Sequence, residues 1–186
     1  MRFGGMQLAF RLDDFLDHFI PPEIRVRPDW HRRARMFMLS HCFGPFLGNV
    51  IPLYLFIVGF PIDYRFWVFA GSITIFWAYP FLLKWTKQYQ SLALVSVQNL
   101  LFCILWACYS YGGIYSPFLP WILISPTLAF FYLPSTGYFR YTLLALIAFN
   151  VLIFAKRVIA GDGFPAVDLE LLQVIGVIST ISASIY

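Results

Sequence analysis

The sequence predicts an all-α membrane protein: a six-transmembrane-helix bundle with an amphipathic cytoplasmic helix at its N-terminus. Of the 186 residues, 60% are hydrophobic and 12% are charged, and this charged share is about half that of a soluble domain. The apolar residues gather in six runs, each close to the roughly 20 residues that cross a hydrocarbon core of about 30 Å. Composition and run length together exclude a soluble globular domain.

Residues 1–30 form a polar leader. From Leu8 to Ile20, hydrophobic residues recur at spacings of three, four and seven between charged residues, which is typical of an amphipathic helix. Such a helix lies at the membrane surface or packs on a partner. Pro21 and Pro22 end it, and the basic residues 31–35 lead into the transmembrane domain, which we expect to cover residues 31–186.

The six apolar runs are separated by loops that contain charged residues, glycine or proline. The runs cover residues 36–58, 66–83, 92–109, 119–133, 141–155 and 168–186. No charge occurs between Val174 and Tyr186, so we expect the sixth helix to be truncated at its cytoplasmic end.

The lysine and arginine residues predict the orientation. With the N-terminus inside, ten of the 13 fall on the inner side of the membrane and three on the outer side. Cytoplasmic loops carry such an excess, so we expect both termini to be cytoplasmic and the turn at 111–118 to face outward. This distribution accounts for the net charge of +4. The expected partner is therefore the lipid bilayer and no nucleic acid.

The sequence contains no recognised catalytic motif: no phosphate-binding loop, no serine elbow, no His-Glu-x-x-His and no paired cysteines. Acidic residues of the outer loops offer oxygen ligands for a divalent metal. We interpret them instead as solvated loop charges and, at Asp168 and Glu170, as residues at a helix start. No catalytic residue, metal or cofactor is therefore assigned.

Polar side chains inside the apolar runs are candidate sensing residues, because polar groups at membrane depth are costly and face the bundle interior. We interpret His41 as an interhelical hydrogen-bonding residue, since no second histidine lies in a run to complete a haem site. The amides are interpreted first as links between helices and second as lining of a ligand pocket. With four residues of the 111–118 turn, the candidates are His41, Asn49, Gln98, Asn99, Gly112, Gly113, Ser116, Pro117, Asn150 and Gln173.

Small residues and prolines indicate how the helices pack. Gly44 and Gly48 in the first run, and Gly176 and Thr180 in the sixth, allow close helix contact, either within the bundle or across a homodimer. Each proline inside a run removes a backbone hydrogen bond and can kink the helix. Kinks leave space between helices, and an apolar pocket for a lipid-like ligand follows as a hypothesis. These prolines are Pro45, Pro52, Pro80, Pro120 and Pro126.

Residues 111–121 and 126–130 resemble the middle of a six-helix sensor region found at the front of bacterial membrane-bound sensor histidine kinases. Related regions precede class III nucleotide cyclases. Residues 32–37, 40–45 and 76–80 are similar to the alphaproteobacterial kinase version, and the likeness covers residues 30–186. It implies a dimeric bundle in the bacterial inner membrane that passes a signal through its sixth helix to a cytoplasmic output domain.

Three functions stay open. The first is the sensor and anchor region of a two-component histidine kinase, and the second is the membrane anchor of a class III cyclase. The third is an accessory integral-membrane subunit that packs in a larger membrane complex. The chain contains no phosphotransfer helix, ATP-binding domain or cyclase domain, so any enzyme activity belongs to a parent protein.

Overall fold

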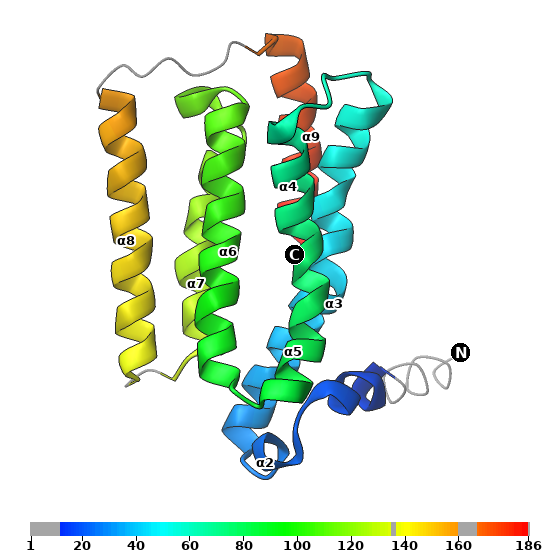
Figure 1. The fold of residues 1–186 in the computed structure, drawn as a ribbon, viewed down its shortest axis with the longest axis vertical. Helices are drawn as coiled ribbons and strands as arrows, with labels where there is room; N and C mark the ends of the chain where they lie inside the picture. Colours follow the sequence, from blue (N-terminus) through cyan, green and yellow to red (C-terminus); the bar gives the residue numbers. More distant parts are fainter. Residues whose placement is uncertain (1–11, 135–136, 160–166, 186) are drawn as a thin grey trace.

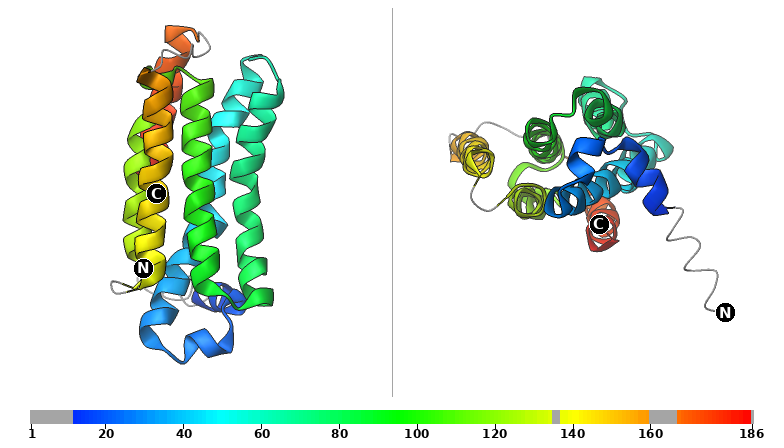
Figure 2. Two further views of the ribbon diagram at one scale, coloured as in Figure 1. Left: turned by 60° about the vertical axis from the view of Figure 1, so that its left-hand side comes forward. Right: turned by 90° about the horizontal axis from the view of Figure 1, so that it is seen from below.

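The structure is a computed structural model that describes residues 12–134, 137–159 and 167–185. Its longer helices run side by side along the long axis of the molecule (Figure 1) and form a bundle when seen from the end (Figure 2), whereas the short helices of the leader lie across one end. The described residues contain no strand, so the all-α prediction is confirmed for them. After a first helix at residues 12–19, the elements are α2 (Pro22–Arg25), α3 (Pro28–Ile57), α4 (Tyr64–Thr74), η1 (Ile75–Ala78), α5 (Tyr79–Thr86), α6 (Tyr89–Ser110), η2 (Gly113–Tyr115), η3 (Leu119–Leu123), α7 (Ile124–Tyr132), α8 (Tyr138–Ile159) and α9 (Leu169–Ile185).

All six predicted runs contain helix, and four of the resulting helices are long and apolar enough to cross a membrane. These four are Pro28–Ile57, Tyr64–Thr86, Tyr89–Ser110 and Tyr138–Ile159. Leu119–Tyr132 and Leu169–Ile185 are shorter apolar helices, about 24 Å and 26 Å long at rises of about 2.0 Å per 3₁₀ residue and 1.5 Å per α residue. The part of the chain that the structure describes therefore has four candidate spans, and the count of six stays a prediction.

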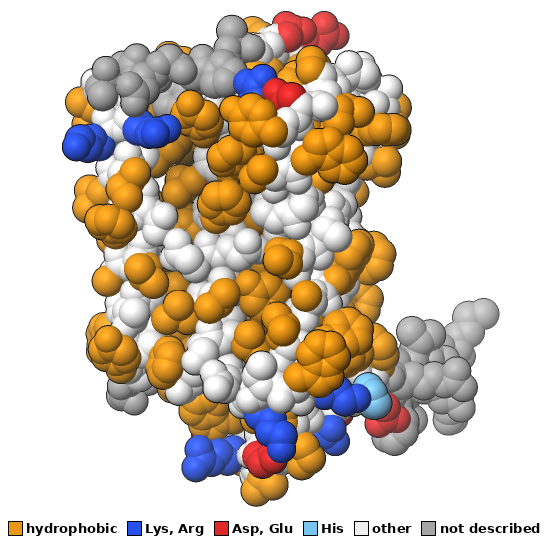
Figure 3. All heavy atoms as spheres, in the orientation of Figure 1, with side chains coloured by type: hydrophobic (Ala, Val, Ile, Leu, Met, Phe, Trp, Pro, Cys, Tyr) orange, Lys and Arg blue, Asp and Glu red, His pale blue; other side chains and the backbone are white. Residues whose placement is uncertain are grey.

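The surface of the bundle has the polarity expected of a membrane protein. Hydrophobic side chains cover the middle of the face seen in Figure 3, and charged side chains gather near its two ends. Many large side chains point outward from the spans, among them Phe46, Trp67 and Leu152. An apolar belt between two charged ends is the surface that a bilayer requires.

The two ends differ in charge. The end that carries the leader, the α5–α6 loop and the α7–α8 connection is called the leader end, and the opposite end, with residues 111–118, the hairpin end (Figure 1). Eight of the described lysine and arginine residues belong to the leader end, and three belong to the hairpin end. The first group is Arg25, Arg27, Arg32, Arg33, Arg35, Lys84, Lys87 and Arg140, and the second is Arg65, Lys156 and Arg157. Arg2 and Arg11 lie outside the described residues.

The described part of the leader packs on the start of α3. Leu16 and Ile20 are buried in the core, Asp17 Oδ1 lies 2.8 Å from His31 Nε2, and Arg35 pairs with Asp13. Leu8, where the predicted amphipathic pattern begins, lies outside the described residues.

Ion contacts also fix the ends of other elements. Glu23 of α2 lies 2.6 Å from Lys87 in the α5–α6 loop, and this hydrogen bond lowers the pKa of Glu23. At the hairpin end, the Asp63 carboxylate accepts hydrogen bonds from the backbone N–H of Arg65 (2.9 Å) and Phe66 (3.3 Å) and so caps α4. A side-chain hydrogen bond from Arg65 (2.7 Å) contributes most to lowering the pKa of Asp63.

The α4–α5 helix is interrupted by the 3₁₀ turn η1, and Pro80 explains why. Proline has no N–H, so it cannot make the α-helical bond to the carbonyl of Phe76; the N–H of Tyr79 donates to that carbonyl instead. In an α-helix, the N–H of Phe76 would bond the carbonyl of Ser72. That carbonyl accepts from the Asn99 side chain of α6 at 2.9 Å, so Asn99 links two helices as predicted.

Candidate functional site

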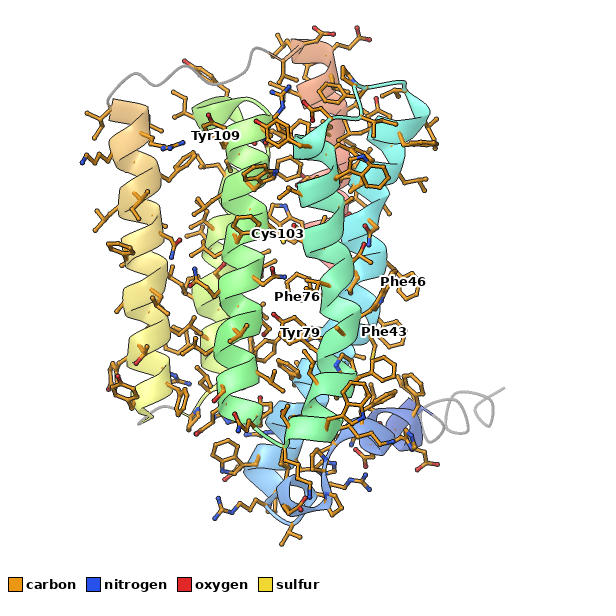
Figure 4. All side chains as sticks on the ribbon, viewed as in Figure 1. Phe43, Phe46, Phe76, Tyr79, Cys103 and Tyr109 are labelled. Carbon is orange, nitrogen blue, oxygen red and sulfur yellow. The ribbon has the colours of Figure 1, made fainter. Side chains whose placement is uncertain are left out.

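A cavity of about 90 Å³ lies inside the bundle, between α3, α4, η1, α6, η3, α7 and α9. It sits where two core clusters meet, one toward the leader end and one toward the hairpin end. Phe76 of η1 and Cys103 of α6 line it, whereas Phe43 and Phe46 of α3 point away from the bundle (Figure 4). Most of the wall is apolar, and its polar side chains are Ser40, His41, Ser96, Tyr132 and Ser182, together with the indole of Trp121.

The sequence of α3 explains why space is left here. Gly44, Pro45 and Gly48 all line the cavity, and glycine contributes no side chain to fill it. Gly48 also lets α4 approach, because a Cβ at this position would lie only 2.8 Å from Ile73 Cγ2. The predicted small-residue face of α3 therefore acts within the bundle.

His41 supplies the most specific chemistry of the cavity. Its side chain is buried, its ring stacks on Phe37 with a centroid distance of 3.9 Å, and Nδ1 lies 2.6 Å from the Phe37 carbonyl oxygen. A carbonyl only accepts, so Nδ1 carries the proton and, in the neutral ring, Nε2 is an acceptor. Nε2 is buried and has no hydrogen-bond partner among the described residues. The predicted interhelical hydrogen bond of His41 is therefore wrong, since its ring donates within α3.

The other polar groups of the wall have partners. The Ser40 hydroxyl contacts the Phe37 carbonyl (3.0 Å) and the Tyr132 hydroxyl, and the Ser96 hydroxyl donates to the carbonyl of Ala93 (3.0 Å). Ser182 of α9 donates to the carbonyl of Leu47 (3.4 Å). Within the part of the chain that the structure describes, His41 Nε2 is thus the one buried side-chain nitrogen or oxygen of the cavity wall without a partner.

Of the 111–118 turn, only Phe118 lines the cavity; the four predicted residues of the turn do not, but the turn packs on α9 beside it. Gly112 has φ +92° and Gly113 φ +59°, conformations that favour glycine, so the predicted turn is confirmed. A Cβ on Gly112 would lie 3.1 Å from Leu172 of α9, and a Cβ on Gly176 would lie 3.4 Å from Pro117. Gly176 of α9 therefore packs on the hairpin, within the bundle.

The predicted amides do not form one site. Asn49 donates to the carbonyl of Pro45 (2.9 Å) in its own helix and accepts a hydrogen bond from the Thr74 hydroxyl of α4 (3.5 Å), so it links two helices as predicted. Asn150 donates to the carbonyl of Leu146 (2.7 Å) within its own helix. Gln98 is partly buried, and its Oε1 has no partner in residues 12–134, 137–159 and 167–185. Gln173 is exposed, so the expectation that it faces the bundle interior is wrong for the single chain.

The remaining predicted residues have local roles. The Ser116 hydroxyl accepts from the N–H of Phe118 (3.4 Å) within the turn. Thr180 is exposed, and its hydroxyl donates to the carbonyl of Gly176 (2.8 Å). Neither residue lines the cavity.

Sequence reasoning missed several residues in and beside the cavity wall, including Ser96, Tyr132, Ser179 and Ser182. Trp121 Nε1 donates to Ser179 Oγ at 2.6 Å, and this bond ties α9 to the cavity wall. A serine or a tyrosine in an apolar run carries little signal by itself. The spacing of Ser40, Gly44 and Gly48, four residues apart, was the available clue to the cavity-lining face of α3.

Comparisons with protein-family models, with curated proteins and with solved structures find no match to this chain. In the described residues, no group of three or more His, Cys, Asp or Glu side chains could hold a metal ion. Among the acidic residues of the predicted outer loops, Asp162 lies outside the described residues. The geometry of the cavity is therefore the basis for a functional proposal.

Proposed function

We propose that this chain is the membrane sensor region of a signalling protein, with the cavity as its ligand site and α9 as its output element. The observation that supports this most directly is the composition of the cavity wall. The wall contains the unpaired His41 Nε2, and it also contains Ser182 and Trp121, which hold α9. A ligand that fills the cavity therefore acts on the contacts that position α9.

The chemistry of the wall selects the class of ligand. A mostly apolar wall favours a neutral, largely apolar molecule, and His41 Nε2 favours one that carries a hydroxyl or N–H donor. A cavity of about 150 Å³ holds benzene, so a phenol-sized ligand exceeds the 90 Å³ seen here. Binding such a ligand would require the wall to move, which is how occupancy becomes a change in helix position.

The experiment compares phenol with toluene, a molecule of the same shape that lacks the donor. The protein is reconstituted in lipid nanodiscs, and binding is followed by the fluorescence of its six tryptophan residues. Hydrogen exchange is then compared between α9 and α8, which contributes no residue to the cavity wall. We expect phenol to bind more tightly than toluene and to speed exchange in α9 but not in α8.

Two results would count against the proposal. If neither compound binds, the cavity is a packing defect. If phenol binds and exchange in α9 does not change, the chain binds a ligand without passing a signal along this helix.

Within this proposal, we place the chain in the bacterial inner membrane as a six-span homodimer with its leader end in the cytoplasm. The excess of lysine and arginine at the leader end supports this orientation. A histidine kinase is the output domain we favour, on the sequence resemblance, and a class III cyclase is the alternative. The gene sequence after Tyr186 tests this: a phosphotransfer helix with an ATP-binding domain supports the kinase, and an immediate stop codon supports an accessory subunit instead.

A further inference from the structure

Two arginine residues from different helices meet at the C-terminal end of α7. Arg33 of α3 donates from Nη1 to the carbonyl oxygens of Phe130 (3.1 Å), Phe131 (2.9 Å) and Leu133 (2.9 Å). Arg140 of α8 donates from Nη2 to the carbonyls of Phe130 (3.0 Å) and Leu133. Because they share two carbonyl oxygens, the two guanidinium groups lie next to each other.

The positive charge of this arginine pair is only partly compensated. A helix C-terminus carries about half a negative charge, against two full positive charges. No ion pair joins a carboxylate of the described residues to Arg33 or Arg140; the ion pairs found there involve His31, Arg35, Arg65 and Lys87. Arg140 is buried, and its Nε has no hydrogen-bond partner within the described chain.

The surroundings of the pair are aromatic and exposed. Phe130, Phe131 and Tyr141 have more than half of their surface accessible, and the Arg140 guanidinium lies 4.7 Å from the centre of the Phe130 ring. The pair belongs to the leader end of the bundle (Figure 1), near the level where lipid headgroups would meet this surface. An anionic group on the arginines and an apolar chain along the phenylalanines would together match this surface.

We propose that Arg33 and Arg140 form a binding site for a phosphate group, supplied by the headgroup of an anionic phospholipid. Arg33 is partly exposed, and its Nε and Nη2 are not engaged by the carbonyls of α7. These two donors are arranged for bidentate binding of phosphate oxygens. Arg140 keeps its hydrogen bonds to the carbonyls of Phe130 and Leu133 and contributes its positive charge to the site. Basic sites between transmembrane helices on the cytoplasmic side bind lipid headgroups in this way.

The test uses native mass spectrometry of the whole chain released from nanodiscs that contain equal amounts of phosphatidylglycerol and phosphatidylcholine. The wild type should retain phosphatidylglycerol in preference to phosphatidylcholine. Arg33→Gln should weaken this retention about tenfold or more, since a charge-assisted hydrogen-bonded pair is lost. Arg32→Gln is the matched control, because it removes the same charge one residue away without touching α7, and it should retain phosphatidylglycerol like the wild type.

Adding inorganic phosphate distinguishes the two possible sources of the phosphate group. If phosphate does not displace phosphatidylglycerol, the lipid is the ligand; if millimolar phosphate displaces it and raises the melting temperature by itself, the site takes soluble phosphate. Equal retention of both lipids by the wild type, or unchanged retention by Arg33→Gln, would overturn the proposal and leave the pair as a helix cap. If Arg33→Gln does not fold, the wild type decides the question: a melting temperature that does not depend on phosphatidylglycerol overturns the proposal, and one that rises with it supports the site.

Discussion

Replacing His41 with leucine separates the stability of the bundle from ligand recognition. Leucine approximates the volume of the imidazole and removes the buried Nε2, which has no partner in the described chain. An unsatisfied buried polar atom costs about 1–3 kcal/mol, and the bond from Nδ1 to the Phe37 carbonyl contributes about 1 kcal/mol. The stacked contact with Phe37 contributes about 0.5–1.5 kcal/mol, part of which leucine replaces by apolar contact.

These terms nearly cancel, so His41→Leu should change the free energy of unfolding by no more than about 1.5 kcal/mol. Phenol binding should nevertheless fall about tenfold or more, because the unpaired acceptor of the cavity wall is gone. The loss of binding should be small for toluene, which has no donor. Thermal unfolding followed by tryptophan fluorescence gives the stability, and fluorescence titration gives both affinities.

His31→Leu is the control, because His31 is also in α3 but bonds Asp17 of the leader and does not line the cavity. It should leave phenol binding unchanged. If His41→Leu lowers the free energy of unfolding by more than about 3 kcal/mol, Nε2 makes a stabilising bond in the protein. The assignment of His41 as a vacant acceptor would then be refuted.

Three further predictions concern the elements around the cavity. Asp63→Ala should lower the free energy of unfolding at pH 7 by about 0.5–2 kcal/mol through loss of the α4 cap. The folded-state pKa of Asp63 is lowered, so the stabilisation by the Asp63 carboxylate is present above the unfolded-state pKa. It should be lost as the pH falls from about 4 through the folded-state pKa. The Gly48→Ala variant should be less stable than the Gly71→Ala variant by about 1–3 kcal/mol. A Cβ at position 48 would lie 2.8 Å from Ile73 Cγ2, whereas a Cβ at position 71 would have no neighbouring atom within 4 Å. Ser179→Ala removes the acceptor of Trp121 and should weaken the docking of α9 by about 1 kcal/mol, seen as faster hydrogen exchange in α9.

Each of these has a control and an opposing outcome. Asp63→Asn keeps a capping side chain and should retain most of the stability without the acid dependence; a pH-independent difference between Asp63→Ala and the wild type would show that the charge is irrelevant. Equal stability of the Gly48→Ala and Gly71→Ala variants would mean that Ile73 of α4 can move away from the added methyl group without a cost in free energy. Ser184→Ala should not change exchange at the cavity, because Ser184 bonds the Thr180 carbonyl of its own helix; equal effects of both serine variants would contradict the assigned contact.

The helices were predictable because their signals are local. Long apolar runs and the turn at Gly112 and Gly113 appear in the sequence and recur in the structure at nearly the same residues. The length of the apolar runs was a weaker guide to the number of membrane spans. The fourth run, for example, begins with the 3₁₀ helix η3 and forms only the shorter apolar helix Leu119–Tyr132. The interruption at η1 follows from Pro80, but the bond that Asn99 makes there depends on how two helices face each other.

The site was only partly predictable. His41 was selected because a histidine at membrane depth is unusual, and the structure places it on the cavity wall. Its hydrogen bonding was predicted wrongly, because the carbonyl of Phe37 in its own helix lies within reach. Gln173 was expected inside the bundle by the same reasoning, but its rotation about the axis of α9 leaves it exposed in the single chain.

The sequence by itself therefore determined the class of protein, the positions of its helices and the uneven charge of its two ends. These depend on hydrophobicity, length and local backbone preferences, which neighbouring residues fix. Only the tertiary structure decided that His41 Nε2 is left without a partner among the described residues and that Arg33 reaches the end of α7, about one hundred residues away along the chain. Such contacts depend on how each helix is rotated and packed against the others, and no short stretch of sequence encodes that.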